Sequence, residues 1–333
     1  MVSIQMKGLT QMLKILLASF LFCINLFALQ TITPTKVYNI NGAVMDSVYQ
    51  NNKIYASTNS GVVDILDMNT NKIIKEIKIP QIKDFMGDLI DNHVTSIDVI
   101  GDRLLIVAQA QHGKNEIFIY KDNLEKIISV EKKLSINKAR FITKDKFIFV
   151  TLDSELYTYD MIQNKIISKL DVRNEDSEFN SKFSDFCFND DKTKIALADE
   201  SGIIKIVDLG QNKIIKMLKD GNLDNVFKVQ WKENILITGG KDKKSILYNL
   251  NKNTKKIVNS DFFVYGVALS DNLKLGAYSI DPQNNVVVFE TNSLKKLYKL
   301  TGTNMTITSI VFLSNDEIII ASDSKKINYY KLK

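Results

Sequence analysis

Only two histidines, His93 and His112, are available in this sequence for acid–base catalysis or metal binding near neutral pH. We predict that they lie on opposite faces of the folded chain, because His93 falls between two sequence repeats and His112 falls inside one. A metal ion shared by both is not expected, since zinc sites gather several ligands at one point. We expect His93 to hydrogen-bond to backbone where two repeats meet.

Four aspartates are the other candidates for chemistry, as paired carboxyl groups of a general acid and a general base. They recur at one position of successive repeats, each after an apolar run: Asp199, Asp242, Asp281 and Asp323. This recurrence indicates turn chemistry, because an Asp side chain hydrogen-bonds to the backbone of the turn that follows it. Motifs of nucleotide binding, serine hydrolysis, zinc peptidases and covalent haem attachment do not occur. We therefore expect no catalytic residue, no cofactor and no metal.

The elements that carry these residues are short strands. Residues 194–218 form three β-branched runs separated by turn residues at 199–202 and 210–212, a pattern typical of strands rather than helices. One feature of this unit recurs about every 40 residues along the chain, as an aromatic or aliphatic residue followed by a polar one. It occurs at Leu66-Asp67, Tyr120-Lys121, Tyr159-Asp160, Val207-Asp208, Tyr248-Asn249, Phe289-Glu290 and Tyr330-Lys331. The period predicts an all-β fold, a seven-bladed β-propeller that forms one domain over residues 29–333.

The two ends of this domain complement each other. The last unit, residues 307–332, has three strands and lacks a fourth, whereas residues 36–40 form a lone strand ahead of the first unit. We expect the N-terminal strand to pair beside residues 327–332, since this closes the ring and covers two exposed strand edges.

Residues 1–28 have the features of a signal peptide. Lys7 and Lys14 form a basic start, residues 15–24 form an apolar stretch too short for an ordinary membrane span, and Ala28 occupies the cleavage position. We expect a mature protein that begins near Leu29, in the periplasm, without stable membrane insertion. Two alternatives are a lipoprotein anchored at Cys23 and an uncleaved N-terminal anchor, and both also export the chain.

The remaining composition limits the kinds of partner. After cleavage Cys187 is the only thiol, which we expect to be buried as a small hydrophobe, and no intrachain disulfide is possible. The net charge is +6, but the lysines are spread along the outer strands and only three arginines occur. Lysine on an outer strand discourages edge-to-edge association, so we do not expect nucleic-acid binding.

Function is expected in the connections that exceed the repeat, at residues 80–93, 109–115 and 172–182. We predict that the first and third lie on one face of the ring and the second on the other. The first carries apolar residues that we expect to form a short amphipathic turn of helix, either packed on the rim or exposed as a contact patch. The third is acidic. The predicted partner-binding residues are Phe85, Met86, Leu89, Ile90, Glu175, Asp176 and Glu178.

Two families resemble this chain. The near-regular spacing of the last four strand ends, from Val207-Asp208 to Tyr330-Lys331, resembles that of WD40-type propellers, although the Gly-His pair and the tryptophans of that family are absent. In length, export segment and repeat pattern the whole chain also resembles the accessory L proteins of periplasmic nitrate reductase systems (NapL). That resemblance implies a non-catalytic protein that supports nitrate respiration, through maturation of the reductase or electron delivery to it.

The function predicted from the sequence is therefore a periplasmic accessory scaffold, expected to be monomeric, that docks respiratory proteins such as nitrate reductase subunits. One alternative is an enzyme that uses the central channel of the propeller, of the lactonase or quinone-dependent dehydrogenase type. Trp231 is the only tryptophan, whereas a quinone-binding propeller would normally repeat one in each blade. Another alternative is a scaffold for envelope assembly.

Overall fold

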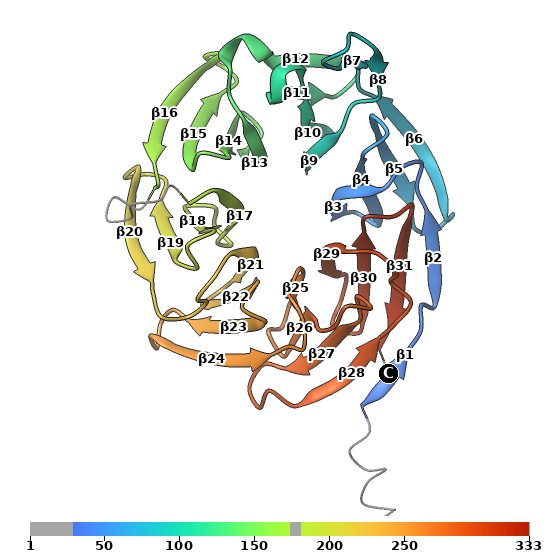
Figure 1. Cartoon of the computed structure of the whole chain (residues 1–333), viewed down its shortest axis with the longest axis vertical. Coiled ribbons are helices and arrows are strands. Elements are labelled where there is room, and N and C mark those ends of the chain that lie inside the picture. Colours follow the sequence, from blue (N-terminus) through green and yellow to red (C-terminus); the bar gives the residue numbers. More distant parts are fainter. Residues whose placement is uncertain (1–28, 174–180, 333) are drawn as a thin grey trace, which may run out of the picture.

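The computed structural model describes residues 29–173 and 181–332, which form seven β-sheets around one axis (Figure 1). Each sheet contains an antiparallel meander, so that the chain moves outward strand by strand before it enters the next blade. The fold is therefore a seven-bladed propeller, as the repeats predict. The recurring residue pairs lie at the end of the third strand from the centre in every blade, which in blade seven is β31.

Blades one to three are built from consecutive strands. Blade one comprises β3 (Val44–Gln50), β4 (Lys53–Thr58), β5 (Val62–Asp67) and β6 (Lys72–Lys78). Blade two comprises β9 (Val94–Ile100), β10 (Arg103–Gln109), β11 (Asn115–Tyr120) and β12 (Leu124–Ile128). Blade three comprises β13 (Ile136–Thr143), β14 (Lys146–Thr151), β15 (Glu155–Asp160) and β16 (Lys165–Asp171).

Blades four to six follow the same plan. Blade four comprises β17 (Phe183–Phe188), β18 (Lys194–Asp199), β19 (Ile204–Asp208) and β20 (Lys213–Leu218). Blade five comprises β21 (Val226–Lys232), β22 (Ile235–Gly240), β23 (Lys244–Asn249) and β24 (Thr254–Asn259). Blade six comprises β25 (Val267–Leu269), β26 (Leu275–Ser279), β27 (Val286–Glu290) and β28 (Lys296–Leu300).

Blade seven closes the ring with strands from both ends of the described chain. It comprises β29 (Ile307–Phe312), β30 (Glu317–Ser322), β31 (Lys326–Lys331) and the N-terminal strand β2 (Lys36–Asn39). β2 runs antiparallel to β31, with Lys36 opposite Tyr329 and Asn39 opposite Lys326. The predicted closure by the N-terminal strand is confirmed. The closing strand is held to the last strand by backbone hydrogen bonds and by packing of Tyr38 and Ile40 against Ile327, so closure depends on noncovalent contacts.

The N-terminal segment also does something that the sequence analysis did not anticipate. A short strand before β2, β1 (Gln30–Ile32), pairs in parallel with β28 and becomes a fifth strand of blade six. The first eleven described residues therefore join two blades, six and seven, from the outside of the ring (Figure 1).

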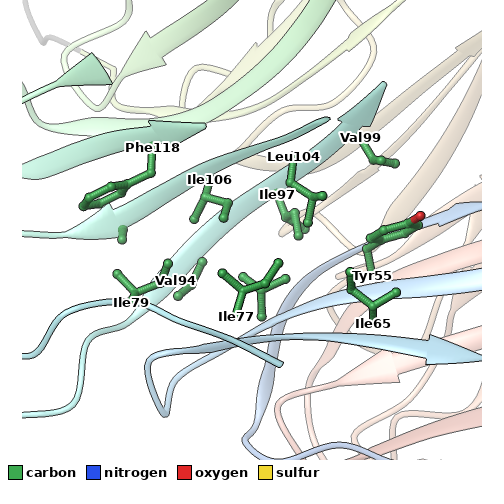
Figure 2. Packing of buried hydrophobic residues seen from close by; sticks show 12 residues of the cluster. Tyr55, Ile65, Ile77, Ile79, Val94, Ile97, Val99, Leu104, Ile106 and Phe118 are labelled. Carbon is green, nitrogen blue, oxygen red and sulfur yellow. The ribbon is translucent and has the colours of Figure 1, made fainter. Parts of the chain in front are cut away.

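The hydrophobic core is divided among the junctions between blades. Each of the seven clusters of buried apolar residues draws its members chiefly from two neighbouring blades. Figure 2 shows one, in which Tyr55 and Ile65 of blade one face Leu104, Ile106 and Phe118 of blade two. Because strand side chains alternate between faces, Ile106 joins this cluster while Leu105 joins the next one. The middle strands are buried on both faces, which explains why they are almost continuously apolar.

Candidate docking site

The long connections between and within blades meet on one face of the ring. The backbone N–H of Gln109, at the end of β10, donates to the carbonyl of His93, directly before β9 (2.9 Å). Strand direction alternates in each meander, so the second strand ends where the first began. The prediction that residues 109–115 lie on the opposite face from residues 80–93 is therefore wrong, as is the placement of His93 and His112 on opposite faces.

The described ends of the third long connection lie on the same face. The N–H of Glu200, in the turn after β18, donates to the carbonyl of Lys182 (3.1 Å). The prediction that the first and third connections share a face is therefore confirmed for these ends. The acidic residues predicted to bind a partner, Glu175, Asp176 and Glu178, lie outside the described residues.

Residues 80–93 form a small β-hairpin, so the predicted turn of helix is wrong. Its strands are β7 (Ile82–Lys83) and β8 (Leu89–Ile90), with Ile82 opposite Ile90 and Lys83 opposite Leu89. Asp84 organises the turn, because its Oδ1 accepts hydrogen bonds from the N–H groups of Met86 (2.8 Å) and Asp88 (2.9 Å). A side chain that bonds the backbone in this way competes with helix formation. The apolar spacing allowed a helix, but the aspartate favours a turn.

The apolar side chains of this hairpin are exposed. The exposed fractions are 95% for Phe85, 73% for Met86, 64% for Leu89 and 37% for Ile90. Of the two outcomes that the sequence left open, packing on the rim and exposure as a contact patch, the structure shows exposure. Four adjacent exposed apolar residues are unusual on a protein surface and mark contact sites in many proteins.

The base of the hairpin is fixed to the ring. Asn92 is buried, and its Nδ2 donates to the carbonyls of Pro80 (3.2 Å) and Gln109 (2.9 Å). The N–H of Ile79 donates to the carbonyl of Gly61 (2.8 Å) on the other side. Gly61 has φ +71°, and a Cβ there would lie 3.2 Å from the Asn92 nitrogen, so this close approach favours glycine. The ring therefore positions a hairpin whose tip is free.

A groove of about 830 Å³ separates the hairpin from the turn between β10 and β11. One wall is the hairpin, including Ile82, Phe85 and Ile90, and the other is residues 109–113. A second hollow of about 400 Å³ adjoins Leu89, Asn92 and Phe118. These volumes are in the range of pockets that hold ligands or side chains of a partner.

The hairpin is acidic although the chain is basic. Residues 80–93 contain one lysine, Lys83, and three aspartates, Asp84, Asp88 and Asp91, whereas the whole chain has a net charge of +6. Of two lysines in the neighbouring blade, Lys126 is neutralised by an ion pair, whereas Lys114 keeps its charge and donates to a hydroxyl. Lys114 Nζ donates to Ser135 Oγ (3.0 Å), and Lys126 pairs with Glu116 (2.8 Å). The local field at the hairpin therefore favours a basic partner.

A separate group of charged residues lies on the innermost strands, where the sequence analysis singled out none. Asp46 of blade one pairs with Arg140 of blade three (2.7 Å), and Asp185 of blade four pairs with Lys138 (2.5 Å). Burial alone would raise the pKa of Asp46, but Arg140, with Lys138 and Lys228, holds that pKa below its ordinary value. An enzyme that acted in the channel would need charged side chains that are free to contact a substrate. The hydrogen-bond partners of these residues therefore show whether they are free.

The carboxylates of these innermost strands bind backbone of the next blade. Asp46 accepts from the N–H of Ile97 (3.1 Å) and Asp185 from that of Val229 (3.0 Å). Asp98 accepts from the N–H of Phe141 (2.7 Å), and burial raises the pKa of Asp98. An innermost strand pairs on one side only, so its free N–H groups need acceptors. These carboxylates therefore have a structural role, which is to hydrogen-bond the innermost strands of different blades to one another.

The sequence predicts turn chemistry for all four recurring aspartates, and the structure confirms it for Asp199 and Asp281. Asp199 accepts from the N–H of Ser201 (2.9 Å) and Asp281 from that of Asn285 (3.0 Å). Asp242 instead accepts from the N–H of Leu223 (3.0 Å), across the junction of two blades. Within the part of the chain that is described, no three His, Cys, Asp or Glu side chains are grouped as metal ligands.

Cys187 is of intermediate exposure, so the expectation of a buried thiol holds in part. It lies on the innermost strand of blade four and packs against the cluster shared with blade five. Burial raises the pKa of its thiol, so the reactive thiolate is disfavoured.

Comparison with solved structures identifies the fold. A chain of "Crystal Structure of Mitotic Checkpoint Complex" superposes with a TM-score of 0.71 at 14% identity, covering 92% of this chain and 93% of that one. The Cps50 (Swd1) β-propeller domain of Myceliophteria thermophila superposes with a TM-score of 0.72 at 12% identity, covering 90% of this chain and 99% of that one. The fold is a WD40-type seven-bladed β-propeller. At these identities the likeness concerns the fold alone.

No protein-family model matches the chain, and no curated protein matches it. Among the described residues, no helix has the length and apolar character to cross a membrane.

Proposed function

We propose that this chain is a non-catalytic docking protein of the periplasm, exported by residues 1–28, that binds a protein partner through the β7–β8 hairpin. The exposure of Phe85, Met86 and Leu89 on a hairpin anchored to the ring is the observation that carries the proposal. Neither blade one nor blade two uses these side chains in its core. Exposed apolar side chains are unfavourable in water, and a partner protein that covered them would remove this unfavourable contact.

The proposed partner is a protein of periplasmic nitrate respiration, such as a subunit of the reductase. This part of the proposal rests on the resemblance of the whole chain to the NapL accessory proteins. The function would be maturation of the reductase or electron delivery to it, without a cofactor or metal bound by this chain itself.

Affinity capture from periplasm of nitrate-grown native cells tests the proposal. The bait is the mature chain, compared with a Phe85→Ala, Leu89→Ala double variant and with Ile162→Ala as a matched control. Ile162 is 78% exposed but lies in the turn after β15, on the other face. We expect the double variant to lose reductase subunits and the control to retain them.

Thermal unfolding of the same three proteins separates docking from folding. Exposed side chains contribute little to stability, so all three should melt within a few degrees of one another. Retention of the partner by the double variant would contradict the proposed site. Capture of other proteins in place of reductase subunits would contradict the nitrate role.

A further inference from the structure

Both edges of the hairpin have backbone N–H and C=O groups that no other strand pairs with in the described residues. The N–H of Asp84 donates to the carbonyl of Asp88 (2.9 Å), so these residues form a hydrogen-bonded pair. In an antiparallel ladder such pairs alternate with pairs whose N–H and C=O groups point outward. Lys83 and Leu89, the next pair, therefore direct their backbone groups away from the hairpin. Within residues 29–173 and 181–332 no strand pairs with either edge.

Three features thus coincide at one place: two unpaired strand edges, exposed apolar side chains, and a groove of about 830 Å³. An unpaired edge binds an extended segment through main-chain hydrogen bonds, and pockets beside it select alternate side chains. A folded domain with a flat surface would leave the groove and the edges unused.

We propose that the groove between the β7–β8 hairpin and residues 109–113 binds an extended segment of a partner protein in which apolar residues alternate with lysine or arginine. The proposal rests on the docking function proposed above and names the chemistry of the segment. The apolar residues enter the groove against Ile82, Phe85 and Ile90, and the segment pairs with one edge of the hairpin.

The basic character follows from charge. Asp88 and Asp91 lie on the hairpin, and the side chain of Asp84 is held in the turn with one oxygen facing the N–H groups of Met86 and Asp88. Lys83 is the one lysine on the hairpin and lines the groove, so the three aspartates of residues 80–93 outnumber it. Nearby, Lys126 pairs with Glu116, and Lys114 donates to Ser135 and keeps its charge. An alternating side-chain pattern places every second residue of a strand on one face, so cations on the other face can reach these carboxylates.

A second copy of this chain is a weaker candidate for the occupant. Its outer strands have suitable chemistry, as in β20, where Ile215 and Met217 are exposed between lysines. A hairpin that bound an outer strand of another copy would make a head-to-tail contact that leaves both molecules free to bind further copies. Such contacts produce open chains, which the lysines of the outer strands oppose.

Binding of synthetic peptides tests the proposal. The probe is a fluorescein-labelled ten-residue peptide that alternates lysine with isoleucine or phenylalanine. A matched peptide has glutamate in place of lysine, and a third carries N-methyl groups on the backbone nitrogens of one edge. Fluorescence anisotropy measures the affinity of each for the mature chain at low and at physiological salt.

We expect the lysine peptide to bind at least about tenfold more tightly than the glutamate peptide, a difference of about 1.4 kcal/mol. The N-methylated peptide should bind as weakly as the glutamate peptide, because it cannot donate to the hairpin edge. The double substitution Asp88→Asn, Asp91→Asn should reduce the preference for lysine, and Ile90→Ala should weaken the lysine peptide. Ile162→Ala should change neither affinity.

Equal binding of the lysine and glutamate peptides, or no saturable binding of either, would overturn the inference. If the Phe85→Ala, Leu89→Ala variant nevertheless loses its periplasmic partner, the docking site stands and only the chemistry assigned to the segment is wrong. Light scattering of the mature chain provides a further check, since concentration-dependent association that this double variant abolishes would show that the occupant is a second copy.

Discussion

Two connections between blades lie on the same face, and one exposes its apolar side chains whereas the other packs them together. Residues 80–93, between blades one and two, leave Phe85, Met86 and Leu89 exposed. Residues 260–266, between blades five and six, pack their aromatic rings together. Phe262 stacks on Phe263 with ring centroids 4.7 Å apart, and Tyr265 stacks on Phe227 of β21 at 5.0 Å.

The difference shows which apolar residues on this face need an explanation. The rings of residues 260–266 are half-buried and contact one another and the adjacent innermost strand, so their packing supports the fold. The hairpin side chains have no comparable cover, although the base of the hairpin is anchored by Asn92. Both connections are rich in apolar residues, so composition does not distinguish them. They differ because the hairpin exposes its apolar side chains while its base is anchored to the ring.

Both connections are attached to one ring, whose blades are joined by ion pairs such as Asp46–Arg140. Substitution Asp46→Asn breaks the pair with Arg140 and leaves the guanidinium buried without its counterion, which should cost about 3 kcal/mol of unfolding free energy. Chemical denaturation at neutral pH measures this cost. The isosteric amide can still accept from the N–H of Ile97, but its NH2 group cannot accept from the N–H of Ser47 (3.0 Å), so the loss combines the charge with that hydrogen bond.

The same substitution gives a prediction about pH. The pKa of Asp46 in the folded chain lies below its ordinary value of 3.8, so its charged form stabilises the fold above about pH 4, and this contribution is lost as pH falls through the folded pKa. The difference in stability between the wild type and Asp46→Asn should therefore shrink in acid. A difference that is constant from pH 7 to pH 3 would show that the charge of Asp46 is not what stabilises the ring.

The aromatic connection should be sensitive to truncation. We expect Phe227→Ala to cost about 2 kcal/mol, less than for a fully buried ring, because Phe227 is partly exposed and stacks on Tyr265. Denaturant unfolding of this variant beside Phe85→Ala measures the contrast. Similar losses for both would mean that the hairpin is also part of the core and would remove the distinction between the two connections.

The anchor of the hairpin should have a smaller effect. Asn92→Ala removes two partly buried hydrogen bonds to backbone carbonyls and should cost about 1 kcal/mol. Hydrogen exchange should then accelerate at residues 82–90 and remain unchanged in blade four. Gln81→Ala is the control, because its hydrogen bond to Asp91 lies on the surface. Uniform acceleration over the whole ring would show that Asn92 supports the fold and not the hairpin.

The repeats predicted the ring because each blade uses the same local pattern of short apolar strands that end at polar residues. Pairs such as Val207-Asp208 and Tyr248-Asn249 mark where a buried strand reaches solvent, and this boundary depends on sequence alone. Closure by β2 could be predicted because blade seven was one strand short. The parallel strand β1 could not, since Gln30–Ile32 has three residues and no pattern that specifies its partner β28.

The candidate site was predicted in its residues but not in its geometry. Phe85, Met86, Leu89 and Ile90 were identified from composition, whereas their hairpin depends on one side chain, Asp84, that satisfies the turn. The face of residues 109–115 differs from the prediction because strand direction alternates through the meander, so the second strand of a blade ends on the face where the first begins. The acids on the innermost strands were missed because Asp46, Asp98 and Asp185 bind backbone of another blade, which no local pattern reveals.

Site-specific crosslinking in living cells tests the central claim most directly. A photoreactive benzoylphenylalanine placed at Phe85 should form an adduct with one periplasmic protein on irradiation, and mass spectrometry identifies that protein. The same group placed at Ile162, which is similarly exposed on the opposite face, should not form the adduct. An adduct of equal yield at both positions, or none at Phe85, would contradict the account of the β7–β8 hairpin as the docking site.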